Sequence, residues 1–256
     1  MNPIELLSEE AGVLKASFDS AMVGAGFTQY TLYALLCLIL TVVVVMVAGK
    51  RLTLVPHNKF VNMVEYGYAM VRQQIGEGAI GHGYRRHIPF LATLFFFILI
   101  CNVIGLIPGS KAATGSLSIT WALALISFVY FNYWGVKAHG GLGYIKSIAP
   151  SGLPKPLVPV IWFFEFISLC LRALTLAVRL YGNMFAGHMV LGIFALATSI
   201  FIQTALAGDA LMFLPPIGWM LLLIIMYALE CLVAFLQAYV FTTLSAVYIG
   251  LATSEH

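Results

Sequence analysis

Long apolar runs dominate the chain, and short stretches rich in charges, glycines and prolines separate them. A run of about 18 or more apolar residues with few charges can cross the hydrocarbon core of a bilayer as a helix. The runs lack the strict alternation of polar and apolar residues that a membrane-spanning β-barrel needs. The pattern therefore predicts an all-α polytopic membrane protein, with residues 1–256 forming a single membrane domain.

Three of the runs have the length of an upright span, and they cover residues 27–48, 89–107 and 117–136. Residues 1–26 form a mixed, amphipathic lead-in, which is acidic where a signal peptide would be basic, so we expect no cleavable leader. Between the first two spans, residues 52–87 form a predicted loop with an interfacial amphipathic helix. Its apolar face is expected at Phe60, Val64, Tyr68 and Val71.

The last two runs, residues 157–206 and 217–252, are too long for upright spans. Fifty residues of helix extend about 75 Å, whereas the hydrocarbon core is about 30 Å thick. Residues 157–206 are therefore either two spans broken near Gly182-Asn183 or one strongly tilted helix. Pro215 and Pro216 separate this run from the next.

Positive charge gathers on one predicted side of the membrane. Lys50, Arg51, Arg85 and Arg86 lie between the first and second spans, and further lysines follow the third. By the positive-inside rule, these loops and the C-terminus are inside and the N-terminus is outside. Only 9% of residues are charged and the net charge is +3, which gives no indication of nucleic-acid binding.

The cysteines give no sign of a metal site or of a disulfide framework. Cys37, Cys101, Cys170 and Cys231 stand singly in apolar segments, where small core residues are the expected interpretation. We expect neither a metal nor a cofactor. The chain also lacks the Gly-x-x-x-x-Gly-Lys-Ser/Thr loop of nucleotide-binding proteins, so we do not expect it to be an enzyme acting on nucleotides.

Arg179 is the residue that costs most to place in a membrane, since insertion of Arg at a helix centre costs roughly 2.5 to 3.5 kcal/mol. At about 100° per residue it belongs to one face of a helix, which we call the polar stripe: Glu165, Ser168, Arg172, Thr175, Arg179 and Asn183. An intramembrane charge of this kind indicates a functional site. The structural alternative is a helix-packing seam, with Arg179 extending to the interface and Ser168 and Thr175 bonding to their own backbone.

Several other polar residues lie in the apolar runs. Glu230 and Gln237 are seven residues apart and share a helix face, with Tyr248 further along, while Asn102 is in the second span. His188 is nine residues after Arg179, which turns it to the opposite side of the helix. His188 and Glu230 could exchange protons or simply be bonded to each other. For Asn183 and Gln237 the structural alternative is a bond that holds two helices together.

The block Arg179-Leu180-Tyr181-Gly182-Asn183-Met184-Phe185-Ala186-Gly187-His188 resembles subunit a of the F-type ATP synthase, the stator subunit beside the rotating c-ring. Further similar blocks are residues 102–108, 165–168 and 236–241, and the resemblance covers nearly the whole chain. It implies that residues 157–206 and 217–252 form a strongly tilted helical hairpin against the c-ring. It also implies a multi-pass protein of an energy-transducing membrane, either the bacterial plasma membrane or the mitochondrial inner membrane.

The resemblance further implies roles for individual residues. Arg179 would be the essential arginine that faces the ring carboxylates, with Asn183 and Gln237 as its polar neighbours. His188 and Glu230 would belong to the outside half-channel. We also expect a supporting polar path of Glu165, Arg172, Ser168, Thr175, Asn102 and Tyr248. Within it, Arg172 either lines the inner path or only binds lipid headgroups. Gly105 stands where some bacterial members have Asp, so a carboxylate function there does not carry over.

The expected function is proton translocation through two offset half-channels, which Arg179 separates and which are coupled to ring rotation. The expected partners are c-ring subunits, b-type subunits of the peripheral stalk, other ATP synthase subunits and membrane lipids. An alternative is an autonomous channel or secondary transporter in which Arg179 binds an anionic substrate. The charges and Gly/Pro breaks of the two halves of the chain do not correspond, which argues against the inverted-repeat class of transporter.

Overall fold

The computed structural model describes residues 28–50, 59–81, 83–107, 110–141, 143–144, 157–206 and 214–253. Within these ranges the chain is built of helices, and five of them are long and apolar enough to cross a membrane. The prediction of an all-α polytopic membrane protein is therefore confirmed. The N-terminal lead-in predicted at residues 1–26 lies outside the described residues.

The five long helices are α2 (Gln29–Lys50), α5 (Ile88–Gly105), α6 (Leu117–His139), α8 (Val158–Leu206) and α9 (Leu214–Thr253). Pro89 is at the start of α5, where its missing N–H costs nothing. Short elements connect the long helices: α3 (Lys59–Met70), the π-helix η1 (Val71–Glu77), α4 (Gly78–Ile80), and the 3-10 helices η2 (Tyr84–Arg86) and η3 (Ala113–Gly115).

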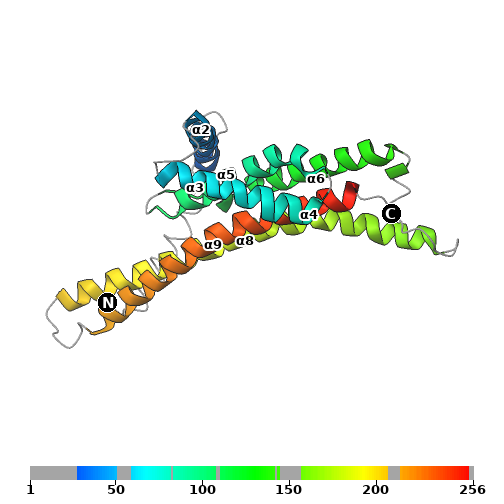
Figure 1. Cartoon of the computed structure of the whole chain (residues 1–256). Coiled ribbons are helices and arrows are strands. Elements are labelled where there is room, and N and C mark those ends of the chain that lie inside the picture. Colours follow the sequence, from blue (N-terminus) through cyan, green and yellow to red (C-terminus); the bar gives the residue numbers. More distant parts are fainter. Residues whose placement is uncertain are drawn as a thin grey trace.

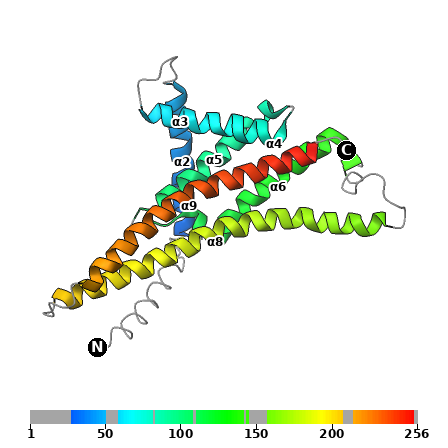
Figure 2. The same ribbon diagram turned by 60° about the horizontal axis from the view of Figure 1, so that its bottom comes forward.

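The two longest helices, α8 and α9, lie side by side (Figures 1 and 2), and Figure 2 shows that their axes run obliquely to that of α2. α8 is one helix of 49 residues and continues through Gly182 and Asn183, so the alternative of two spans broken there is wrong. The pair is antiparallel, because Asn183 bonds to Gln237 whereas Phe201, further along α8, stacks on Trp219 near the start of α9. The polar residues of both helices are thereby brought to the same seam.

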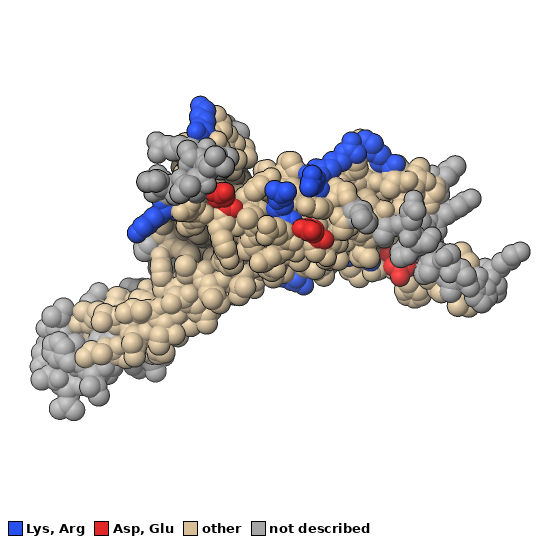
Figure 3. Space-filling view, viewed as in Figure 1, with Lys and Arg blue, Asp and Glu red and all other residues tan. Residues whose placement is uncertain are grey.

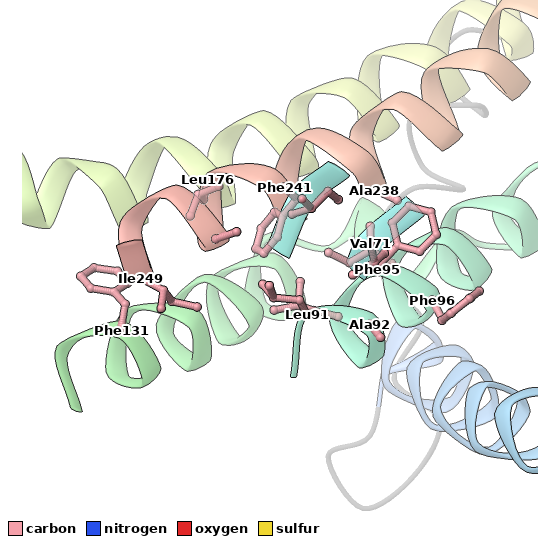
Figure 4. Close-up of a cluster of buried hydrophobic side chains, with 14 of the residues drawn as sticks. Val71, Leu91, Ala92, Phe95, Phe96, Phe131, Leu176, Ala238, Phe241 and Ile249 are labelled. Atoms are coloured by element: carbon pink, nitrogen blue, oxygen red, sulfur yellow. The ribbon is translucent and has the colours of Figure 1, made fainter. Parts of the chain in front are cut away.

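A buried apolar cluster holds the hairpin against the other helices (Figure 4). Five elements contribute large, fully buried side chains to it: Val71 from η1, Leu91 and Phe95 from α5, Phe131 from α6, Leu176 from α8, and Phe241 and Ile249 from α9. Close packing of this kind fixes the rotation of α8 and α9 about their own axes. It thus determines which side chains of these helices remain at the surface.

The segment after α2 differs in detail from the predicted amphipathic helix. Its buried positions in α3 are Val61 and Val64, whereas Phe60, which was predicted to be on the apolar face, is 42% exposed and Tyr68 is 43% exposed. The face is set by the neighbours: α3 packs on α2, and Gly67 lies against the Phe96 ring of α5. Val71 is buried, as predicted, but it is the first residue of a π-helix in which Ile75 is also buried.

The end of α9 is pressed closely against this same segment. A Cβ atom on Gly250 would come within 2.5 Å of the carbonyl oxygen of Ala79 in α4. Only glycine permits such an approach of one helix to the backbone of another. The described C-terminal end of α9 is therefore fixed to the turn that precedes α5.

Candidate functional site: a polar seam on the long hairpin

The rotation of α8 presents the polar stripe at the surface. Its core-facing side chains are Ala173, Leu176, Ala177, Leu180 and Met184, all buried. At 100° per residue the polar stripe lies about a quarter turn away from them. Accordingly Thr175, Arg179 and Asn183 are exposed, while Glu165, Ser168 and Arg172 are half-buried.

Arg179 lies near the middle of α8 and has an exposed side chain next to the exposed apolar side chain of Val178. Within the described part of the chain, no carboxylate forms an ion pair with it. An unpaired guanidinium on a membrane helix is costly unless a partner or water compensates its charge. The exposed side chain of Arg179 is therefore accessible to water or to another molecule.

The N-terminal part of the polar stripe partly fits the structural alternative, in which its side chains bond within their own helix. The Thr175 hydroxyl donates to the Arg172 carbonyl over 3.0 Å, which is a bond within its own helix. The Arg172 guanidinium lies 5.4 Å from the ring centroid of Tyr248 on α9, within cation–π range. The structure thus brings together Arg172 and Tyr248, which the sequence had placed in two different runs.

One hydrogen bond joins the two long helices close to Arg179. Asn183 Nδ2 donates to Gln237 Oε1 over 2.7 Å, one helical turn after Arg179. Gln237 is only 3% exposed, and its Nε2 atom has no hydrogen-bond partner among the described residues. The amide pair therefore lies at the boundary between the exposed polar stripe and the buried seam.

A second polar cluster fixes α9 to the end of α5. Asn102, fully buried, donates through Nδ2 to the Ala234 carbonyl over 3.0 Å and accepts from the Thr114 hydroxyl over 2.8 Å. Ala234 lies on α9 between Glu230 and Gln237. The Tyr227 hydroxyl, one turn before Glu230, donates to the Leu106 carbonyl. These bonds set the position of α9 along its axis relative to α5.

Glu230 is buried against a glycine of α8. It is 4% exposed, and a methyl group at Gly187 would overlap its carboxylate. His188 follows directly and turns toward the end of α5, where a Cβ atom on Gly105 would lie 3.2 Å from His188 Nε2. Glu230 of α9 thus lies against the turn of α8 that carries His188.

The structure does not join His188 and Glu230 by a direct hydrogen bond. His188 Nε2 and Glu230 Oε1 are buried and, like Gln237 Nε2, have no partner among the described residues. Leaving a buried polar group unpaired costs about 1 to 3 kcal/mol. The simple bonded pair that would serve stability alone is therefore not what the structure contains.

Four residues of the seam were not predicted as site residues. Gly187 leaves room for the Glu230 carboxylate, because a Cβ atom at this position would overlap it. Tyr227 could have been found, since it lies three residues before Glu230 on one helix face. Thr114 and Gly105 act through contacts between distant segments, which no local pattern indicates. Within the described ranges, no group of three His, Cys, Asp or Glu side chains could hold a metal ion.

Comparison with known proteins identifies the family of this chain. The family model described as ATP synthase A chain matches residues 30–250. ATP synthase subunit a of a Nocardioides species is 37% identical over 241 residues, covering 90% of this chain and 84% of that protein. The subunit a of a Methylobacterium species is 35% identical over 224 residues, covering 88% and 86%.

A third relative, ATP synthase subunit a of Chloroherpeton thalassium, is 41% identical over 195 residues; the match covers 76% of this chain and 55% of that protein. The family match and the five apolar helices together identify an integral membrane protein. The chain belongs to the ATP synthase A chain family, the family of ATP synthase subunit a.

Proposed function

We propose that this chain translocates protons as subunit a of an F-type ATP synthase, with Arg179 separating two offset half-channels beside a ring of carboxylate-bearing subunits. The observation that carries the proposal is the exposed guanidinium of Arg179 near the middle of α8, with which no described carboxylate pairs. A charge in that position calls for an acidic partner on another chain. A passing ring carboxylate is such a partner.

The chemistry of arginine fits this task. A positive charge within about 4 to 6 Å lowers the pKa of a carboxyl group by ~1 to 3 units, so a ring carboxyl that reaches Arg179 would release its proton. The guanidinium itself does not lose its proton, because its own pKa is above about 12. Arg179 would thereby force release on one side and block direct proton passage between the half-channels.

His188 and Glu230 would form the outside access path to the ring. Imidazole and carboxyl groups can take up and release protons in the physiological range when their surroundings tune them. His188 Nε2 and Glu230 Oε1 are buried without a hydrogen-bond partner among the described residues, which supports the idea that both side chains exchange protons with a path rather than serve packing. Asn183 and Gln237 would orient the approach to Arg179, and the bonds of Asn102 would keep Glu230 in register.

The other end of the polar stripe would line the inner path, with Glu165, Ser168, Thr175, Arg172 and Tyr248. In this arrangement α8 and α9 lie strongly tilted in the membrane, and α3 lies at the interface. The N-terminus would be outside and the C-terminus inside. The c-ring would face the polar stripe, while b-type subunits of the peripheral stalk and other ATP synthase subunits complete the complex.

The proposal is tested by changing Arg179→Ala and Arg179→Lys in the intact complex and measuring ATP-driven acidification of membrane vesicles. Both variants should assemble and both should fail to pump, because alanine removes the charge and a desolvated lysine can lose its proton. Arg72→Ala, which removes an exposed charge from η1, is the matched control and should pump normally. Substantial pumping by the Arg179→Ala variant ends the proposal, and transport by the purified chain alone favours the autonomous channel.

A further inference from the structure

A group of cations and aromatic rings lies at the junction of η2, α5 and α6, far from the polar stripe along the chain. The Arg86 guanidinium lies 4.6 Å from the ring centroid of Trp134, and the Lys137 ammonium lies 4.9 Å from the same centroid. The two cations are therefore no more than about 9.5 Å apart. Figure 3 shows Lys and Arg side chains gathered on the α6 side of the molecule.

Among the described residues, no acidic side chain balances these two positive charges. Within the described part, neither Arg86 nor Lys137 forms an ion pair, and both side chains are exposed. Like charges held close together around one ring repel each other, and the Trp134 ring compensates only part of that repulsion. An anion that contacts both cations would relieve it.

The rings beneath the cations hold them in place. His87 is buried, shares a 3.1 Å hydrogen bond with the Tyr130 hydroxyl, and meets the Trp134 ring edge-on at 5.0 Å. Tyr130 in turn stacks on Phe90 at 3.8 Å. A platform that joins the start of α5 to the end of α6 thus presents Arg86 and Lys137 in fixed positions.

The position relative to the membrane decides which anion fits. The group lies where the apolar helix α5 begins and where α6 ends, which is the level of lipid headgroups. An exposed apolar surface continues from Lys137 down the same face of α6: Ile126, Val129 and Tyr133 are 54%, 63% and 58% exposed. A ligand with an anionic head and a long apolar tail matches both parts.

We propose that Arg86, Lys137 and Trp134 form a binding site for the phosphate of an anionic phospholipid, with an acyl chain along Ile126, Val129 and Tyr133. Arginine and lysine both bind phosphate oxygens, and basic sites between membrane helices bind acidic lipid headgroups. The site is independent of proton translocation. A lipid seated there would hold the ends of α5 and α6 together.

The test uses the full chain in lipid vesicles with Trp134 as the sole tryptophan, after Trp121, Trp162 and Trp219 are changed to Phe. The probes are phosphatidylglycerol and phosphatidylcholine brominated near the headgroup end of one acyl chain, which quench indole fluorescence on contact. We expect phosphatidylglycerol to associate with Trp134 in preference, with a contribution on the order of fivefold from each cation. Equal quenching by the two lipids would overturn the proposal.

Charge variants separate a built site from general attraction. The double change Arg86→Gln and Lys137→Gln should abolish the preference, whereas Arg86→Lys should keep most of it. The matched control, Lys50→Gln with Lys59→Gln, removes the same charge from exposed positions at the end of α2 and the start of α3 and should leave the preference intact. A control that loses the preference equally contradicts a defined site.

Two further measurements distinguish a bound lipid from a free anion and test the site in the intact complex. Inorganic phosphate added to the vesicles should leave the quenching unchanged; displacement of the lipid by phosphate would mean that the site binds a free anion instead. In the intact complex, the amount of phosphatidylglycerol that copurifies should fall in the Gln variants and remain unchanged in the control. Unchanged retention in the Gln variants would count against the site even if their fluorescence were altered by local unfolding.

Discussion

Asn183 on α8 donates a 2.7 Å hydrogen bond to Gln237 on α9, one turn from the exposed charge of Arg179. The bond uses one oxygen of Gln237 and leaves the Nε2 atom of that amide buried without a partner in the described chain. A bond kept only for stability would pair both ends of the amide. Gln237 therefore has two roles to distinguish. In the structural role its amide only connects α8 and α9, and in the functional role it serves proton translocation beside Arg179.

We expect Gln237→Leu to reduce ATP-driven proton pumping strongly while changing the thermal stability of the complex only slightly. Interhelical bonds of this type contribute only about 0.6 to 2 kcal/mol, so their loss leaves the fold intact. Vesicle acidification and thermal unfolding measure the two effects. The control is Ser127→Ala, which removes the 2.9 Å hydroxyl bond between Ser127 of α6 and Ser245 of α9. If both variants pump equally well, Gln237 only connects helices.

The pair His188 and Glu230 should tolerate exchange better than loss. The double change His188→Glu with Glu230→His keeps one acid and one imidazole at the seam, whereas Glu230→Ala removes the carboxyl group. We expect the exchanged variant to retain more ATP-driven acidification than Glu230→Ala, at matched amounts of complex. If the exchange is as inactive as the single loss, or if Glu230→Ala pumps normally, the outside path runs through other residues.

Asn102 and Thr114 should be energetically coupled. Asn102→Leu leaves the buried Thr114 hydroxyl without its acceptor, and an unsatisfied buried group of this kind costs about 1 to 3 kcal/mol. Thr114→Val should cost less once Asn102 is already Leu, giving a coupling of roughly 0.5 to 3 kcal/mol in a double-mutant cycle. Detergent unfolding of the purified full chain measures it. Strict additivity would mean that the two side chains act independently.

Acid should weaken the junction of α5 and α6 through His87. Burial, together with the neighbouring Arg86 charge, lowers the pKa of His87, which lies just before α5 and bonds to Tyr130. A lowered pKa means that the folded state disfavours protonation, so the contribution of His87 is fully present above the unfolded value of about 6.5. It is lost as the pH falls from there through the folded pKa.

Thermal unfolding of the purified full chain between pH 7.5 and 5 checks this expectation. The wild-type midpoint should drop across this range more than that of His87→Gln, which keeps a polar partner for Tyr130 but does not titrate. His139→Gln is the control for a histidine at the end of α6 whose side chain is less buried. Parallel pH profiles for wild type and His87→Gln would refute the assignment.

The helices and the polar stripe could be predicted from the sequence because both depend on local periodicity. The excess length of residues 157–206 already required a helix that is not upright or a break, and the structure decides for one helix. Of the predicted apolar face of α3, Phe60 is exposed whereas Val61 beside it is buried, because contacts with α2 and with Phe96 select the side of α3 that packs against this chain. The roles of Gly187, Gly105 and Thr114 depend on residues far away in the chain, and periodicity contains no information about such pairs.

The glycine contact at Gly250 has a mechanical consequence. One end of α9 is pressed against Ala79, whereas the other end of the hairpin extends beyond the remaining described helices (Figure 1). The hairpin is thus anchored near one end, and its resistance to sideways bending depends on how well α8 and α9 resist sliding past each other. In the part that extends beyond the other helices, Trp219 resists such sliding through ring contacts with Phe194 at 5.5 Å and Phe201 at 6.0 Å. Nearer the anchored end, the hydrogen bond between Asn183 and Gln237 does the same.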